Sequence, residues 1–151
     1  MEKVEKLVSP WCKYRIQWDE MLDKITIIRQ IDNEFYLMRH LVKKLYVISA
    51  RESIDVVKVA RRDGEVVFGS TGVPHADYPP TSKSYVRTHQ YLGGYVLRPD
   101  AANPDHTRFH MIFHADLNMP RLLAPVVAKF KPKLMCQKLE NLKKAIDRFQ
   151  I

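Results

Sequence analysis

Three residues that could take part in acid–base catalysis, Asp55, His110 and His114, lie in stretches whose pattern is typical of apolar strands. A carboxylate and an imidazole can act as acid and base when both point into one cavity within hydrogen-bond reach. One hypothesis is therefore a hydrolase or cyclase in which His110 or His114 acts together with Asp55. It requires the imidazole and the carboxylate to face the same cavity.

Metal and cofactor chemistry is not indicated by the sequence. His110 and His114 are four residues apart. On a strand this spacing separates them by about 13 Å, which is too far for both to bind one metal ion. The other histidines have no Cys or carboxylate at ligand spacing, and there is no phosphate-binding loop, nucleophile elbow or dinucleotide fingerprint. We therefore expect neither a metal nor a cofactor.

The surroundings of Asp55 are open to two interpretations. Strand alternation gives it three neighbours on one face of the strand: Ser53, Val57 and Val59. This face is either solvated or lines an interior. In an interior the carboxylate needs a charged partner, and Arg51 and Arg61 are the nearest in sequence.

The elements that must position these residues are short strands joined by turns. Strands are predicted over residues 25–31, 35–42, 52–62, 65–70 and 109–114, from their β-branched and alternating apolar residues. Asp63-Gly64 is a dipeptide favoured in two-residue hairpin turns. Residues 85–97 form a strand pair or one long bent strand with a turn or bulge at Gly93-Gly94. The stretches 43–50 and 72–82 are predicted loops.

Two short helical segments are expected at the start of the chain. Residues 1–8 have an amphipathic pattern with glutamates in the favourable first turns. Ser9-Pro10 suits the start of a second helical turn, since Ser favours the N-cap and Pro the first helical position. Three aromatic residues of this turn share one face and are expected to pack in the core: Trp11, Tyr14 and Trp18.

The last part of the chain predicts one long amphipathic helix. After Pro132 its apolar residues are three and four positions apart and form one stripe: Met135, Leu139, Leu142, Ile146 and Phe149. A single helix that follows a run of antiparallel strands indicates an α+β fold in which the helix covers the sheet. With 151 residues, the chain is expected to form one domain.

The composition, 46% hydrophobic and 28% charged, is that of a globular protein and argues against disorder. The net charge is +8, and residues 119–151 contribute +6 of it, with six Lys and two Arg against one Glu and one Asp. This basic helix could attract anionic lipid or nucleic acid, or be a solvated face. A nucleic-acid-binding sheet would expose aromatic residues between lysines, whereas Trp11 and Trp18 are expected to be buried. Cys12 and Cys136 are expected to be reduced thiols.

Several motifs together resemble the START domain family of lipid-binding proteins. They follow the order and approximate spacing of that family across almost the whole chain: Arg15-Ile-Gln-Trp18-Asp19, Ile48-Ser-Ala-Arg51-Glu52, Val73-Pro-His75, Pro79-Pro80, Tyr85-Val86-Arg87, Phe113-His-Ala-Asp116-Leu117 and Asn141-Leu-Lys-Lys-Ala-Ile146. The resemblance implies a helix-grip fold, in which a curved antiparallel sheet clasps a long C-terminal helix. A hydrophobic tunnel between them would hold one lipid, such as a sterol, phospholipid or ceramide, and the stretch 43–50 would be its lid.

The chain departs from the family pattern at three places. It begins near the family's second helix, so that the first helix and first three strands have no counterpart, and the shortened sheet could expose an edge for self-association. Arg51-Glu52-Ser53 stands where the family has Arg, Asp and an aromatic residue. Asn118-Met119-Pro120 stands where the family has a Gly and an aromatic residue.

The expected tunnel lining comes from strands and from the final helix: Val57, Val59, Met111, Phe113, Val126, Val127, Phe130 and Leu134. From the residues alone, a solid core is the simpler alternative. Asp55, with Arg51 or Arg87, is expected at the polar end.

The function that the resemblance implies is non-catalytic binding of a sterol or phospholipid and its transfer between membranes. The protein would be cytoplasmic and would contact anionic membranes peripherally, without binding nucleic acid. Pro125 and Pro132 each remove a backbone donor and are expected to weaken the local ladder of helix hydrogen bonds. Residues 120–132 are therefore expected to move as a gate while residues 135–149 anchor the helix.

Overall fold

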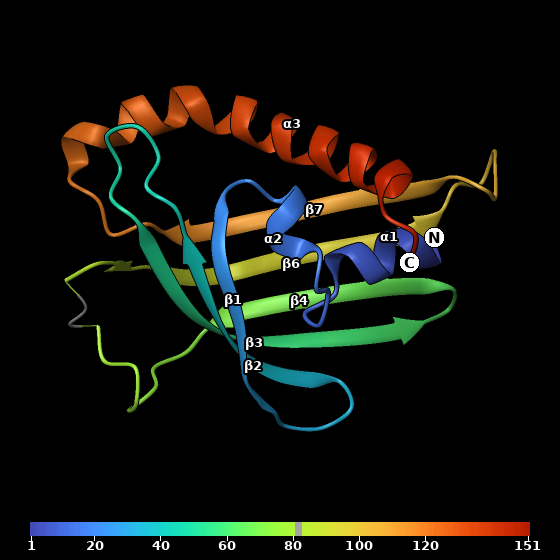
Figure 1. The fold of residues 1–151 in the computed structure, drawn as a ribbon, viewed down its shortest axis with the longest axis horizontal. Coiled ribbons are helices and arrows are strands. Elements are labelled where there is room, and N and C mark those ends of the chain that lie inside the picture. Colours follow the sequence, from blue (N-terminus) through green and yellow to red (C-terminus); the bar gives the residue numbers. More distant parts are fainter. Residues whose placement is uncertain (81–82) are drawn as a thin grey trace.

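A long helix lies across one face of a curved seven-stranded sheet in the computed structural model, which describes residues 1–80 and 83–151 (Figure 1). The helical elements of this part are α1 (Glu2–Val8), α2 (Arg15–Trp18), a 3₁₀ turn η1 (Arg121–Leu123) and α3 (Ala124–Arg148). The strands are β1 (Leu22–Gln30), β2 (Phe35–Val42), β3 (Arg51–Arg62), β4 (Glu65–Gly72), β5 (Val86–Arg87), β6 (His89–Pro99) and β7 (Thr107–Asp116). The predicted α+β helix-grip arrangement is confirmed.

The sheet is built mainly from neighbours in sequence. Its order is β1-β2-β3-β4-β6-β7, and each neighbouring pair in this order is antiparallel. The two-residue β5 lies outside this order and pairs with β3 in parallel. The β3–β4 hairpin turns at Asp63-Gly64, as predicted. Both residues have positive φ, 52° and 76°, which matches the hairpin turn type that follows the twist of the strands.

The stretch 85–97 differs from both predicted forms. It contains β5 and most of β6, and these two strands do not pair with each other. Gly93-Gly94 is not a turn but lies within β6, at a close approach to β4. Gly94 has φ of 136°, and a Cβ on it would lie 1.7 Å from the Phe68 carbonyl oxygen. Only glycine fits there.

The first helices also differ from their prediction. Ser9 closes α1 instead of opening a second helix, and its Oγ donates to the Glu5 carbonyl at 2.7 Å. Because α2 begins only at Arg15, the three aromatic residues do not share one helix face. Trp18 is buried and donates through Nε1 to the Leu7 carbonyl at 3.1 Å, but Trp11 is 45% exposed.

The solid core occupies one end of the molecule, where α1 and the last turns of α3 meet the sheet (Figure 1). Its buried apolar side chains come from the helical segments at both ends of the chain, including α2, and from four strands: Val4, Leu7, Val8, Trp18, Tyr36, Met38, Val57, Val59, Val66, Phe68, Leu97, Leu142, Ala145 and Phe149. The Tyr14 and Phe149 rings stack at 4.5 Å and join the two ends of the chain. Burial of such side chains contributes ~1.5–3 kcal/mol each, so this end anchors the fold.

The two halves of α3 pack differently. The buried residues of α3 are Asn141, Leu142 and Ala145, all in its second half. The predicted apolar stripe is wrong at Leu139, which is exposed, while Lys138 beside it is partly buried. The inward face of the helix therefore carries Lys138 where the apolar pattern predicts Leu139.

The two helix prolines are not equivalent. Pro125 lies in the first turn of α3, where a backbone N–H has no acceptor within the helix, so the prediction that it weakens the ladder is wrong. Pro132 lies inside the helix, where it removes one hydrogen bond. Cys12 and Cys136 are free thiols, as predicted.

Candidate ligand cavity

A cavity of about 550 Å³ lies between the sheet and the first half of α3. This volume is within the range of small-molecule binding sites. Strands β1, β2, β3, β4, β6 and β7 contribute lining residues, as does the stretch 43–50 between β2 and β3. From α3 the lining includes three short side chains: Ala124, Val127 and Ala128. The molecule is therefore solid at one end and hollow at the other.

Seven of the predicted ligand residues line this cavity: Arg51, Asp55, Val57, Met111, Phe113, Val127 and Leu134. Four others lie elsewhere. Val59 is fully buried in the solid core, and Val126 and Phe130 are exposed on α3. Arg87 is bound to Glu52 and is not part of the lining. Val59 shares the strand face of Asp55 and Val57 but lies further along β3, within the solid core, whereas Val126 and Phe130 lie on the exposed side of α3.

Asp55 belongs to the interior, the second of the two interpretations. Its side chain is 1% exposed, and its Oδ2 accepts a hydrogen bond from Ser53 Oγ at 2.6 Å. The same oxygen lies 2.8 Å from Nδ1 of His40, which is on β2. The predicted partners Arg51 and Arg61 are wrong, since Arg61 binds Glu5 instead. Asp55 Oδ1 has no hydrogen-bond partner among the described residues.

Sequence reasoning missed a second polar cluster in the lining. It joins α2, β6 and α3 through four side chains: Arg15, Asp19, Tyr95 and Lys138. Asp19 Oδ2 lies 2.9 Å from Lys138 Nζ and accepts from Arg15 Nε at 3.3 Å. Arg15 also donates through Nη2 to Tyr95 Oη at 2.5 Å and through Nη1 to the Val8 carbonyl at 2.9 Å. A search for buried charge at helical spacing, such as Arg15 and Asp19, could have found it.

The mutual attraction of the cluster's charged groups favours the ionised forms of Asp19 and Lys138. Burial alone would raise the pKa of Asp19, but Lys138 and Arg15 outweigh it and hold the pKa below its usual value. Burial likewise opposes ionisation of Lys138, yet Tyr95 and Asp19 raise its pKa overall. Two cations therefore face one carboxylate in a buried place. Asp19 Oδ1 has no hydrogen-bond partner within the described part of the chain.

The stretch 43–50 contacts the first half of α3 over the cavity (Figure 1). The Tyr46 ring stacks on the Phe130 ring with centroids 5.4 Å apart. At the base of this stretch, Arg51 donates to the Ser49 carbonyl at 2.9 Å and to the Leu117 carbonyl at 3.0 Å. Arg51 thus ties the end of the loop to the segment that leads from β7 into α3.

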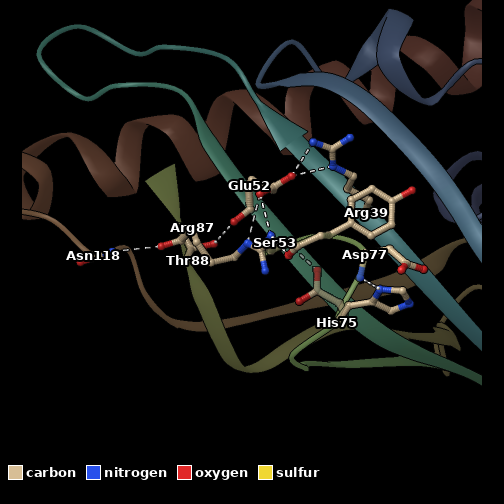
Figure 2. A network of polar contacts seen from close by, with 10 residues as sticks. Arg39, Glu52, Ser53, His75, Asp77, Arg87, Thr88 and Asn118 are labelled. Carbon is tan, nitrogen blue, oxygen red and sulfur yellow. Dashed lines mark hydrogen bonds and ion pairs between the residues drawn. The ribbon is translucent and has the colours of Figure 1, made fainter. Parts of the chain in front are cut away.

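Glu52 is the centre of a polar network that crosses the sheet (Figure 2). Its Oε1 binds Arg39 Nη2 at 2.6 Å and its Oε2 binds Arg87 Nη2 at 2.8 Å. The carboxylate is buried, which would raise its pKa, but these two arginines lower it overall. Asn118 Nδ2 donates to the Arg87 carbonyl at 3.3 Å, so the network also reaches the segment before α3.

The predicted acid–base pair does not form. His110 and His114 are exposed and do not line the cavity, whereas Met111 and Phe113 do. The carboxylate of Asp55 is paired with His40 instead. The described residues contain no group of three or more His, Cys, Asp or Glu that could hold a metal ion. No helix in residues 1–80 and 83–151 is long and apolar enough to cross a membrane.

The chain is similar to known lipid-transfer proteins. Residues 3–144 match the model of the START domain. The chain is 27% identical to human StAR-related lipid transfer protein 6, over 87% of this chain and 60% of that protein. It is 28% identical to mouse StAR-related lipid transfer protein 5, over 89% of this chain and 64% of that protein. It therefore spans less than two thirds of the length of these relatives. The structure of human StAR-related lipid transfer protein 5 superimposes with a TM-score of 0.88 at 29% identity, covering 98% of this chain and 70% of that one.

Proposed function

The chain belongs to the START domain family, and on this premise we propose that it binds one lipid molecule in its cavity and transfers it between membranes. The observation that carries the proposal is the 550 Å³ cavity itself, because it lies where the helix and the sheet would otherwise form a solid core. A cavity whose walls are mainly apolar, with polar groups that can fix the orientation of a ligand, is suited to a lipid of the sterol or phospholipid class.

The polar group of the lipid would bind at Asp55. Its Oδ1 is an available acceptor in the lining, and His40 and Ser53 hold the other carboxylate oxygen in place. Arg51 is also part of the lining and brings a positive charge. The apolar body of the lipid would lie against Val57, Met111, Phe113, Val127 and Leu134.

Loading would require the stretch 43–50 to part from α3. The stacked rings of Tyr46 and Phe130 form a contact between them, and both residues are exposed. Leu122, 89% exposed, lies on η1, directly before α3. Exposed apolar side chains next to the basic residues of α3 would let this end touch an anionic membrane surface.

A matched pair of substitutions tests the proposal. Val127→Trp would fill the cavity, whereas Val126→Trp places the same side chain on the exposed face of α3. Transfer of a fluorescent sterol or phospholipid between anionic vesicles should be lost with V127W and retained with V126W. Equal transfer by both variants, at unchanged stability, would show that the lipid does not occupy this cavity.

A further inference from the structure

Two carboxylates in the cavity wall each hold one buried oxygen without a hydrogen-bond partner in the described residues, Asp19 Oδ1 and Asp55 Oδ1. Both side chains are 1% exposed. A buried acceptor without a donor is costly, because it has lost its hydrogen bonds to water and gained none in return. Each of these oxygens is therefore a place where a donor from a bound molecule would be accepted.

The two acceptors belong to separate clusters. Asp55 is held by Ser53 and His40, and Asp19 by Arg15 and Lys138, with no residue in common. The second cluster also includes Tyr95 on β6. Tyr95 lies opposite Phe68 on β4, which in turn lies opposite Val59 on β3. Val59 is four residues from Asp55, which is about 13 Å along a strand. One small polar group cannot serve both acceptors.

The charges around Asp19 select the kind of donor. Lys138 and Arg15 already supply two positive charges to one carboxylate, so a cationic group of a ligand would be repelled there. An anionic group would be repelled by the unpaired carboxylate oxygen of Asp19. A neutral hydroxyl satisfies the site, because it can donate to Asp19 Oδ1 and accept from a remaining N–H of Lys138 or from the Tyr95 hydroxyl.

Resting on the proposed lipid-binding function, we propose that the cavity prefers a lipid with a hydroxyl group at each end over one with a single polar end. One hydroxyl donates to Asp55 Oδ1 and the other to Asp19 Oδ1, with an apolar body between them. The Arg15–Asp19–Tyr95–Lys138 cluster is then a second polar subsite as well as a structural contact.

The probes are 1-dodecanol and 1,12-dodecanediol, which differ only in the second terminal hydroxyl. Their affinities are measured by displacement of a fluorescent lipid from the purified chain. The diol should bind about tenfold more tightly, because the second hydroxyl gains a hydrogen bond to a charged group. Asp19→Asn should reduce this preference, whereas Asp147→Asn on the exposed side of α3 should leave it unchanged.

Each outcome separates this inference from the proposed function. Equal affinity of the two alcohols, or tighter binding of 1-dodecanol, overturns the two-ended ligand while lipid binding stands. Failure of both alcohols and of the fluorescent lipid overturns both proposals. Because the comparison of the two alcohols uses the unaltered chain, it decides the question even if D19N does not fold.

Discussion

Lys138 Nζ lies 2.9 Å from Asp19 Oδ2, and this ion pair joins the middle of α3 to the residue that follows α2. The pair lies at the boundary between the solid core and the cavity. Beyond it, toward Phe149, α3 packs on the solid core, and before it, toward Ala124, α3 faces the cavity. The inward-pointing Lys138 therefore lies where α3 changes from packing on the solid core to lining the cavity.

Replacement of Lys138 by Met should destabilise the protein. The change keeps an unbranched side chain of similar length but leaves the buried Asp19 carboxylate with Arg15 as its one remaining cationic partner of the cluster. Removal of one partner of a buried pair costs ~3 kcal/mol. For a chain of this size we expect the thermal midpoint to fall by roughly 6–12 °C in circular dichroism. Lys144→Met on the exposed face is the control, and an equal midpoint for both variants would contradict the importance of the pair.

Acid should destabilise the fold in a defined range. The folded-state pKa values of Asp19 and Glu52 are lowered, so the unfolded chain binds protons first as the pH falls. The stabilisation is complete above the unfolded values of about 4 and is lost as the pH falls through the lower folded values. Thermal midpoints measured between pH 7 and pH 3 should be flat above pH ~5 and fall below it. A midpoint that rises toward pH 3 would refute this.

The two central glycines of the β4–β6 pair should respond differently to alanine. A Cβ at Gly94 would meet the Phe68 carbonyl oxygen, and its φ of 136° is unfavourable for any other residue. At Gly69 a Cβ has nothing within 4 Å. We expect G94A to lose about 3 kcal/mol in urea unfolding, or to fail to fold, and G69A to remain near the parent. Similar losses at both positions would contradict the close approach.

The contact between Tyr46 and Phe130 should control access to the cavity. Its removal by Tyr46→Ala costs about 1 kcal/mol of ring stacking, which corresponds to roughly a fivefold change in an opening equilibrium. We expect faster release of a fluorescent lipid in stopped-flow experiments with little change in stability, because the ring is exposed. Tyr91→Ala, on another exposed aromatic residue, is the control. Unchanged release from Y46A would place the opening elsewhere.

Local sequence patterns predicted most of the strands, the β3–β4 turn and the long final helix. The Asp63-Gly64 turn is encoded by two residues that accept positive φ, and the alternation of β3 predicted that Asp55 and Val57 share one face, which is the cavity side. The long final helix followed from its spacing. Signals of this kind depend on near neighbours in sequence, so they could be predicted without the tertiary structure.

The polar side of the cavity could not be predicted in this way. Lys138 looks like a solvated lysine until Asp19 and Tyr95 are placed beside it from two other elements. His40 becomes a partner of Asp55 only through the register of β2 and β3, which sets His40 opposite Ser53. Such pairs depend on contacts between distant segments, which a single sequence does not display.

The central claim is that one lipid occupies the cavity between the sheet and α3. Native mass spectrometry of the protein purified from cells tests it most directly. We predict a co-purifying lipid at one per chain, which is absent from V127W and present in V126W. Protein that carries no lipid, and that takes up none from vesicles while folded, would contradict the claim.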